Sequence, residues 1–400
     1  MPIDSAALDT LEADLDHVVR ERIHRTADLI VAAKERGRNV AVITGSGPNI
    51  HEGVTTLLAE LMRVGIVDGI TTSSAVIAHE MGGTLDRVKR CAGEPLDIDP
   101  AWLPRGGDFE LTELDPAALA EIEMQMPIDH ALIERIKSAP GKSIIKAAGN
   151  LGYPMGLWLE KFAIEILALA HVHKKSFEEI AGLGADARTM IGIGARARKP
   201  VMVTIPQLVG GGMIGLCIGD SISLVERATR LAHMLDAADV IIESGVALTQ
   251  EIHDGPFELY TGHGIWSAWQ DHFAYTLEGK SLIRIDLDPA LEQVCAIERE
   301  AGGVQEAITD GLPKTKLFKV PFRMEMSGFA RHEGSIPIIE DIGVVWPLIA
   351  RRVAYKLGIE LDFMSYPQQT RPGMAMREWI VSEVRPMSRS RMLKALHERD

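Results

Sequence analysis

Hydrophobic and polar positions in the first quarter of the chain predict a strand–helix–strand unit. Residues 11–36 carry apolar side chains at helical spacing and are followed by Gly37, which favours a helix end. Residues 39–44 (NVAVIT) are an apolar, β-branched run, typical of a buried strand. Helical spacing returns over 54–64, and 67–72 again has the pattern of a strand. A strand, a helix and a strand in this order predict two parallel strands.

The same alternation continues along most of the chain. Further helices are expected at 129–138, 155–174, 177–196, 221–235 and 265–277, and further strands at 200–208, 239–243 and 281–287. Residues 92–127 break the pattern with prolines, glycines and acidic side chains, which indicates an irregular insertion or a lid. The pattern predicts an α/β domain over residues 1–310, a doubly wound, mostly parallel sheet with helices on both faces.

The periodic pattern weakens after residue 310. A helix is expected at 339–357, and two short helical segments are expected in the arginine-rich stretch 377–398. Their apolar faces need a partner. We therefore predict that 311–400 is a C-terminal helical extension that docks on the core or on a neighbouring subunit.

Composition and charge restrict the class of protein. The formal net charge of −14 disfavours nucleic acid as a partner, because an acidic surface repels a phosphate backbone. Cys91, Cys217 and Cys295 form neither a CxxC metal pair nor a disulfide framework, which suits a reducing cytoplasm. The charged N-terminus lacks the apolar core of a signal peptide, and no long uncharged apolar run predicts a membrane span. We expect a cytoplasmic protein.

A glycine loop directly after the first strand is the first candidate for chemistry. Glycines at this place let backbone N–H groups approach a phosphate at the start of a helix. The usual GxGxxG pattern is incomplete, because Ile50 stands at the third glycine position and no acidic residue ends the second strand. A plain tight turn is the alternative. The candidate cofactor residues of the two strand ends are Gly45, Ser46, Gly47, Asn49, Thr71, Thr72, Ser73 and Ser74.

Two more stretches contain glycines in a pattern that could indicate a cofactor site. Residues 192–197 match GxGxxA, but they lie in a helical stretch before a strand, so we predict helix packing there. Gly211 and Gly212 follow a predicted strand, and residues 219–221 are expected to open a helix. Asp220 and Ser221 are therefore candidates for cofactor contacts, with helix capping as the alternative reading for Asp220.

Residues 243–264 pack polar groups beside glycines. Glu251, His253, Asp254 and His263 are candidate acid–base groups or ligands of an ammonium group. His79 and Glu80, after the second strand, are a further candidate acid–base pair, with helix capping as the alternative. No metal site is predicted, because the helical HExxH spacing is missing.

The segment Ser46–Met81 (SGPNIHEGVTTLLAELMRVGIVDGITTSSAVIAHEM) resembles the first nucleotide-binding segment of deoxyhypusine synthase, and residues 196–221 resemble a second segment of that family. Similar loops occur in the archaeal and cyanobacterial type of NAD-dependent ornithine cyclodeaminase. The resemblance implies an NAD-binding fold, a homotetramer, and hydride transfer from an amine-bearing carbon to NAD. It further implies that the 46–53 loop lies along the pyrophosphate and that cofactor contacts come from Asn49, Thr71, Thr72, Ser73, Glu80 and Asp220.

One departure from deoxyhypusine synthase changes the expected reaction. The nucleophilic lysine of that family falls on Leu248, and leucine forms no Schiff base. The sequence therefore favours an NAD-dependent enzyme acting on a small amine or amino acid by transient oxidation at the C–N carbon, through deamination with cyclisation or aminoalkyl transfer. Two alternatives stay open. One is a cofactor-independent hydrolase or lyase that binds a phosphate or carboxylate substrate, and the other is a non-catalytic nucleotide-binding protein.

Overall fold

Six parallel strands form the main sheet of the protein. The computed structural model describes residues 3–99, 101, 103, 107–149, 152–203, 211–245, 277–312, 319–320 and 324–398. Within these residues the strand order is β6-β2-β1-β7-β8-β9, and every neighbouring pair is parallel. The strands are β1 (Asn39–Thr44), β2 (Gly69–Thr72), β6 (Val201–Val203), β7 (Ala238–Ser244), β8 (Ser281–Asp286) and β9 (Ser335–Ile339).

Helices cover both faces of this sheet, as the alternation of side chains in β1 requires. Val40 and Val42 point into one core and Ala41 and Ile43 into the other, because successive side chains of a strand face opposite sides. The first core includes residues of α2 (His17–Glu35), α4 (Val54–Arg63) and α19 (Ile342–Leu357), and the second includes residues of α12 (Leu224–Asp236), α15 (Ala290–Ala301) and α18 (Met324–Arg331). The predicted doubly wound α/β fold is confirmed.

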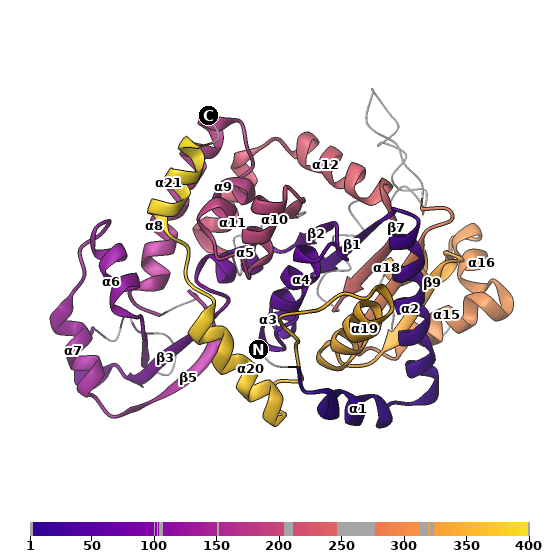
Figure 1. Cartoon of the computed structure of the whole chain (residues 1–400), viewed down its shortest axis with the longest axis horizontal. Helices are drawn as coiled ribbons and strands as arrows, with labels where there is room; N and C mark the ends of the chain where they lie inside the picture. The colour runs from indigo at the N-terminus through magenta and orange to yellow at the C-terminus, as the bar shows by residue number, and fades with distance from the viewer. Residues whose placement is uncertain are drawn as a thin grey trace.

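The chain between β2 and β6 forms a separate layer. A three-stranded antiparallel sheet in the order β4-β3-β5 is built from β3 (Leu85–Ala92), β4 (Asp108–Thr112) and β5 (Gly141–Ala147). With it lie the 3-10 turn η1 (Glu94–Leu96) and the helices α6 (Pro116–Glu123) and α7 (His130–Ser138). This layer lies at the opposite end of the molecule from α15 and α16 (Gly303–Thr309) (Figure 1). Part of the stretch 92–127, which we expected to be irregular, is therefore regular structure.

A cluster of helices joins this layer to the main sheet. It consists of α5 (Ser74–Met81), α8 (Met155–His173), α9 (Phe177–Gly184), α10 (Met190–Ala197) and α11 (Gly212–Ser221). Ser176 and Glu179 form a capping box at the start of α9, which is why the helical pattern restarts there. Gly192 and Gly194 lie in α10, where an added Cβ would lie 1.8 Å from the Asp186 carbonyl oxygen and 2.7 Å from Val201, respectively. The helix-packing interpretation of residues 192–197 is confirmed.

The N-terminal and the C-terminal helices of the chain both pack on the elements described above. The predicted helix over 11–36 is interrupted: α1 (Ser5–Ala13) ends, and α2 begins after the N-cap Asp16, whose carboxylate accepts a hydrogen bond from the Val18 N–H. After residue 310 the chain contributes β9 to the main sheet as well as helices. Here α19 packs on α2, α20 (Arg371–Glu383) packs beside β3 and β5, and α21 (Arg389–His397) packs on α9. Every described helix is too short or too polar to cross a lipid bilayer.

Candidate functional site at the strand-order reversal

The direction of the strand order reverses at β1. Numbered in the order in which they occur in the main sheet, the strands run 3-2-1-4-5-6, since the chain moves outward from β1 to β2 and β6 and returns on the other side with β7, β8 and β9. In open α/β sheets, ligands bind outside the carboxyl ends of the strands where the order reverses, and this order is that of dinucleotide-binding domains. The candidate site therefore lies at the carboxyl ends of β1 and β7.

Glycines with positive φ follow both strands, and a Cβ added at the second, Gly245, would lie 3.3 Å from Asn49 Nδ2. Gly47 has φ +65°, and an added Cβ there would meet nothing within 4 Å. It precedes the short helix α3 (Pro48–His51) and provides no side-chain cap. Gly245, directly after β7, has φ +92°. Both φ values lie in the region that favours glycine, and the open space beside Gly47 is available to a ligand.

Asn49 joins the two loops. Its Nδ2 donates to the Ser244 carbonyl oxygen at 3.1 Å, and the Ser244 hydroxyl donates to Asn49 Oδ1 at 2.7 Å. The indole Nε1 of Trp346, in α19, donates to the Ser244 hydroxyl at 2.8 Å. All three residues are buried. Asn49 is thus part of the wall of the candidate site, and its contact with a cofactor stays a prediction.

The end of β2 carries the predicted Thr71–Ser74 segment. Ser73 is the N-cap of α5, with its hydroxyl accepting from the Val76 N–H at 3.4 Å, while Thr71, Thr72 and Ser74 are buried. The hydroxyl of Thr72 and that of Thr44, the last residues of two adjacent strands, have no hydrogen-bond partner among the described residues. Thr44 was not among the residues that we singled out from the sequence, although it directly precedes the glycine loop.

Residues 211–221 differ from the expected arrangement. Residues 219–221 do not open a helix: they close α11, because the apolar run after Gly211 (GMIGLCIG) is itself helical and buries Ile214 and Ile218. The next helix, α12, is capped by Ser223, so Asp220 is not its cap.

The polar ends of α11 are engaged by protein atoms. At its start, an added Cβ on Gly212 would lie 2.1 Å from Glu160 Oε1, and Glu160 accepts from the Met213 N–H at 2.9 Å. At its end, the Asp220 carbonyl accepts from His171, and the Ser221 hydroxyl donates to the Ile218 carbonyl. Roles for Gly211, Gly212, Asp220 and Ser221 at a cofactor stay predictions.

His79 and Glu80 lie on α5 and are both buried. The Glu80 carboxylate accepts from the Met190 and Ile191 N–H groups at 2.8 and 3.0 Å, so it caps the start of α10; burial raises its pKa to about 7. His79 Nδ1 donates to the Ala148 carbonyl at 2.8 Å, and burial lowers the pKa of His79. A neutral ring with its proton on Nδ1 leaves Nε2 as an acceptor. The four other candidate acid–base residues lie outside the described residues: Glu251, His253, Asp254 and His263.

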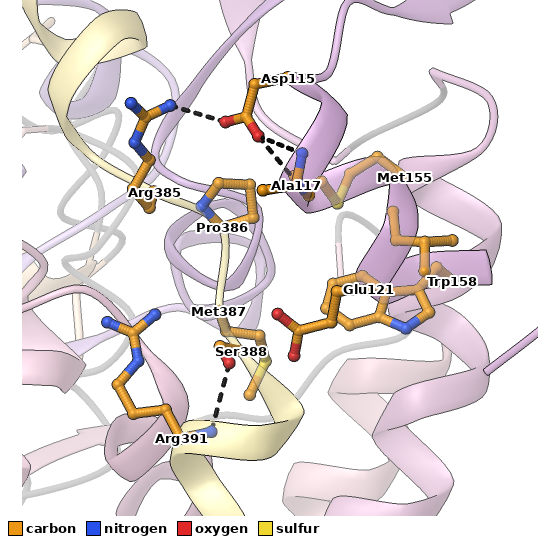
Figure 2. A pocket seen from close by; sticks show the side chains of 12 residues that line it. Asp115, Ala117, Glu121, Met155, Trp158, Arg385, Pro386, Met387, Ser388 and Arg391 are labelled. Carbon is orange, nitrogen blue, oxygen red and sulfur yellow. Dashed lines mark hydrogen bonds and ion pairs between the residues drawn. The ribbon is translucent and has the colours of Figure 1, made fainter. Parts of the chain in front are cut away.

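A cavity of about 360 Å³ lies elsewhere, between α6, α8 and the chain that joins α20 to α21 (Figure 2). Its wall includes Trp158, Glu121 and Arg391, and Arg385 at its rim is ion-paired with Asp115. None of its lining residues follows a strand of the main sheet. Over the described part of the chain, no group of three or more His, Cys, Asp or Glu side chains is placed to hold a metal ion.

Comparisons with known proteins were made by sequence and by structure. No family model and no curated protein matches the sequence. Among solved structures, the apo form of ArgZ, an arginine dihydrolase from the ornithine–ammonia cycle in cyanobacteria, is 12% identical over 83% of this chain and 32% of its own, with a TM-score of 0.39. AgrE in a ternary complex with ornithine and NAD+ is 13% identical over 86% of this chain and 34% of its own, with a TM-score of 0.41.

A third solved structure is a conserved LOR/SDH protein from Methanococcus maripaludis S2. It is 11% identical over 88% of this chain and 71% of its own, with a TM-score of 0.38. The 32% and 34% coverages of ArgZ and AgrE mean that this chain spans about a third of the length of each. Similarities at this level concern the overall fold and assign no activity to this chain.

Proposed function

We propose that this chain is an enzyme that binds NAD at the strand-order reversal and transiently oxidises a small amine or amino acid at its C–N carbon. The observation that carries the cofactor assignment is the strand order 3-2-1-4-5-6, with the Gly45–Gly47 loop following the strand at which it reverses. Among the described residues, the space beside Gly47 is open and the Thr44 and Thr72 hydroxyls have no hydrogen-bond partner, which suits a polar ligand at this edge of the sheet.

The residues of the chain have separate roles in this proposal. The backbone of Gly45, Ser46 and Gly47 would hold the pyrophosphate, and Asn49 would keep the two loops at a fixed separation through Ser244. NAD, when bound, supplies the acceptor for the hydride. The neutral ring of His79 would accept a proton from the substrate at Nε2, since its Nδ1 proton is held by the Ala148 carbonyl.

The substrate class is proposed from the resemblance of Ser46–Met81 to deoxyhypusine synthase and from the similar loops of ornithine cyclodeaminase. Since Leu248 stands at the position of the family's lysine, we propose chemistry on a free amine without a covalent enzyme imine. A homotetramer located in the cytoplasm remains part of the proposal.

An assay of stripped and reloaded protein tests this function. Protein freed of nucleotide is incubated with L-ornithine or with putrescine, with and without added NAD, and ammonia release and reduced nicotinamide are followed. We expect ammonia only in the presence of NAD. Ammonia release from stripped protein would support a cofactor-independent lyase instead, and NAD binding without turnover of either amine would support a nucleotide-binding protein.

A further inference from the structure

Four basic side chains from four separate elements meet beside the glycine loop of β1. They are His51, the last residue of α3; His79 of α5; Lys146 of β5; and Arg377 of α20. Burial lowers the pKa of His51, and the positive charges of Arg377 and Lys146, with that of a protonated His79, lower it further. The cluster lies where the layer inserted between β2 and β6 meets the loop that follows β1.

Hydrogen bonds and packing fix this arrangement. Arg377 Nη2 donates to the Ile145 carbonyl at 2.7 Å, three residues before Ala148, whose carbonyl accepts from His79. The preceding residue of α20, Met376, lies against Gly53, where an added Cβ would be 2.5 Å from its sulfur atom. The end of β5 and the start of α4 thus hold α20 in place beside His51.

Two side-chain nitrogen atoms of the cluster are buried. Neither Nε of Arg377 nor Nδ1 of His51 has a hydrogen-bond partner among the described residues. Burial lowers the pKa of both groups, and for His51 the neighbouring positive charges add to the effect of burial. Buried polar groups without partners are uncommon in folded proteins and are costly, since they have lost their hydrogen bonds to water.

The nearby carboxylates already accept hydrogen bonds from protein atoms, one of them from Lys146 of the cluster itself. Glu110 accepts from Lys146 at 2.6 Å and from Arg90 at 2.5 Å. Glu52 accepts from the backbone and the side chain of Gln368, although its charge also acts on Arg377. Asp86 accepts from the Gly149 N–H, and burial raises its pKa to about 7, which reduces its charge. None of these carboxylates accepts a hydrogen bond from Nε of Arg377 or Nδ1 of His51, although the charges of Glu52 and Glu378 act on Arg377.

We propose that this basic cluster binds the carboxylate of the substrate, with His51 and Arg377 donating to its oxygens. A carboxylate offers two acceptor oxygens to two donors from different elements, and its negative charge suits the Arg377 guanidinium. The substrate class is thereby narrowed from amines in general to amino acids. The role as a substrate anchor depends on the proposed NAD-dependent function, while anion binding at the cluster does not.

The experiment follows the His51 ring by NMR, with the resonance assigned through His51→Gln. The pH titration of His51 is recorded with chloride, with acetate and with inorganic phosphate as the anion. We expect acetate to raise the pKa of His51 by about one unit or more, because a bound negative charge favours the protonated ring. Arg377→Met should abolish this shift. Arg371→Met, at an exposed position of the same helix, should leave it unchanged.

The outcomes separate this inference from the proposed function. A His51 pKa that is insensitive to acetate overturns the inference, and so does a response to phosphate alone, which would indicate a site for a cofactor phosphate. Calorimetric titration of NAD into Arg377→Met is run alongside, and we expect wild-type affinity. A wild-type protein that shows the acetate response but binds no NAD would refute the proposed function while leaving the anion site standing.

Discussion

Asn49 and Ser244 exchange two hydrogen bonds across the strand-order reversal, one from the carboxamide to the serine carbonyl and one from the serine hydroxyl to the carboxamide oxygen. The pair ties the loop after β1 to the end of β7. Because Trp346 donates to the same hydroxyl, α19 is coupled to this pair as well. The walls of the candidate cofactor site are therefore fixed by a buried network before any ligand binds.

Replacing Ser244 with alanine should destabilise the protein substantially. The change leaves Trp346 Nε1 and Asn49 Oδ1 without a partner in a buried place, at about 1–3 kcal/mol for each group. Urea unfolding measures the loss in the free energy of unfolding. The control is Thr229→Ala, which removes an exposed hydroxyl bonded to the Val225 carbonyl and should change stability by less than about 0.5 kcal/mol. Equal effects of the two substitutions would contradict a structural role for the network.

A buried arginine holds the end of β6 to the helices around it. Arg227 donates to Glu178 at 2.6 Å and to the Val203 and Ile218 carbonyls at 2.8 and 2.7 Å. We expect Arg227→Met to lower the free energy of unfolding by about 3–5 kcal/mol, because it leaves the Glu178 carboxylate buried and unpaired. Arg230→Met on the same helix breaks only partly exposed ion pairs and should cost less than about 1 kcal/mol. Chemical unfolding of both variants checks this difference.

Asp86 should make stability depend on pH. Its pKa is raised by burial from 3.8 to about 7, so between these values the folded protein keeps a proton that the unfolded chain releases. The contribution of Asp86 to stability is full below the lower value and is lost as the pH rises to about 7, by about 1.4 kcal/mol per pH unit.

Asp86→Asn removes this dependence. Its stability relative to wild type should rise from pH 5 to about pH 7 and stay constant above it, as measured by urea unfolding across that range. Asp14→Asn, at an exposed position, is the control and should follow the wild-type profile. A stability difference between Asp86→Asn and wild type that does not change with pH would argue against the burial of this carboxyl group.

The main sheet was largely predictable from local patterns. The strand Asn39–Thr44 is observed with the predicted bounds, because a run of apolar residues after a helix end has few alternatives. The small sheet was not predicted. In β3, only some side chains are buried, and charged residues are interspersed among them. Val88 of this strand pairs with Ile144, which comes 56 residues later. Such a distant pairing leaves no local signal. β9 was missed because it is short and contains Pro337.

The candidate site was predictable in part. The glycine loop was predictable because a βα turn directly follows its strand. That strand, β1, is the one at which the strand order reverses. Helix capping was the alternative interpretation of Glu80 and is confirmed, but the sequence did not indicate which helix it caps, since Met190 and Ile191 come from a distant helix. The same holds for the basic cluster, because Arg377 is brought to His51 only by the packing of α20 on Gly53. Proximity that tertiary packing creates is not encoded in residue spacing.

Calorimetric titration of NAD into wild type, Gly47→Ala and Gly65→Ala tests the central claim most directly. Both glycines have positive φ, at +65° and +83°, and open space at the Cβ position, so both substitutions strain the backbone in a similar way. Gly47 follows β1 at the carboxyl edge of the sheet, whereas Gly65 precedes β2 at the opposite edge.

We predict saturable NAD binding by wild type. In Gly47→Ala the affinity for NAD should fall about tenfold or more, which is a loss of about 1.4 kcal/mol or more in binding free energy. In Gly65→Ala the affinity should stay within about twofold of wild type. Absence of saturable binding at millimolar NAD, or equal affinities of the two glycine variants, would contradict a dinucleotide site at the strand-order reversal.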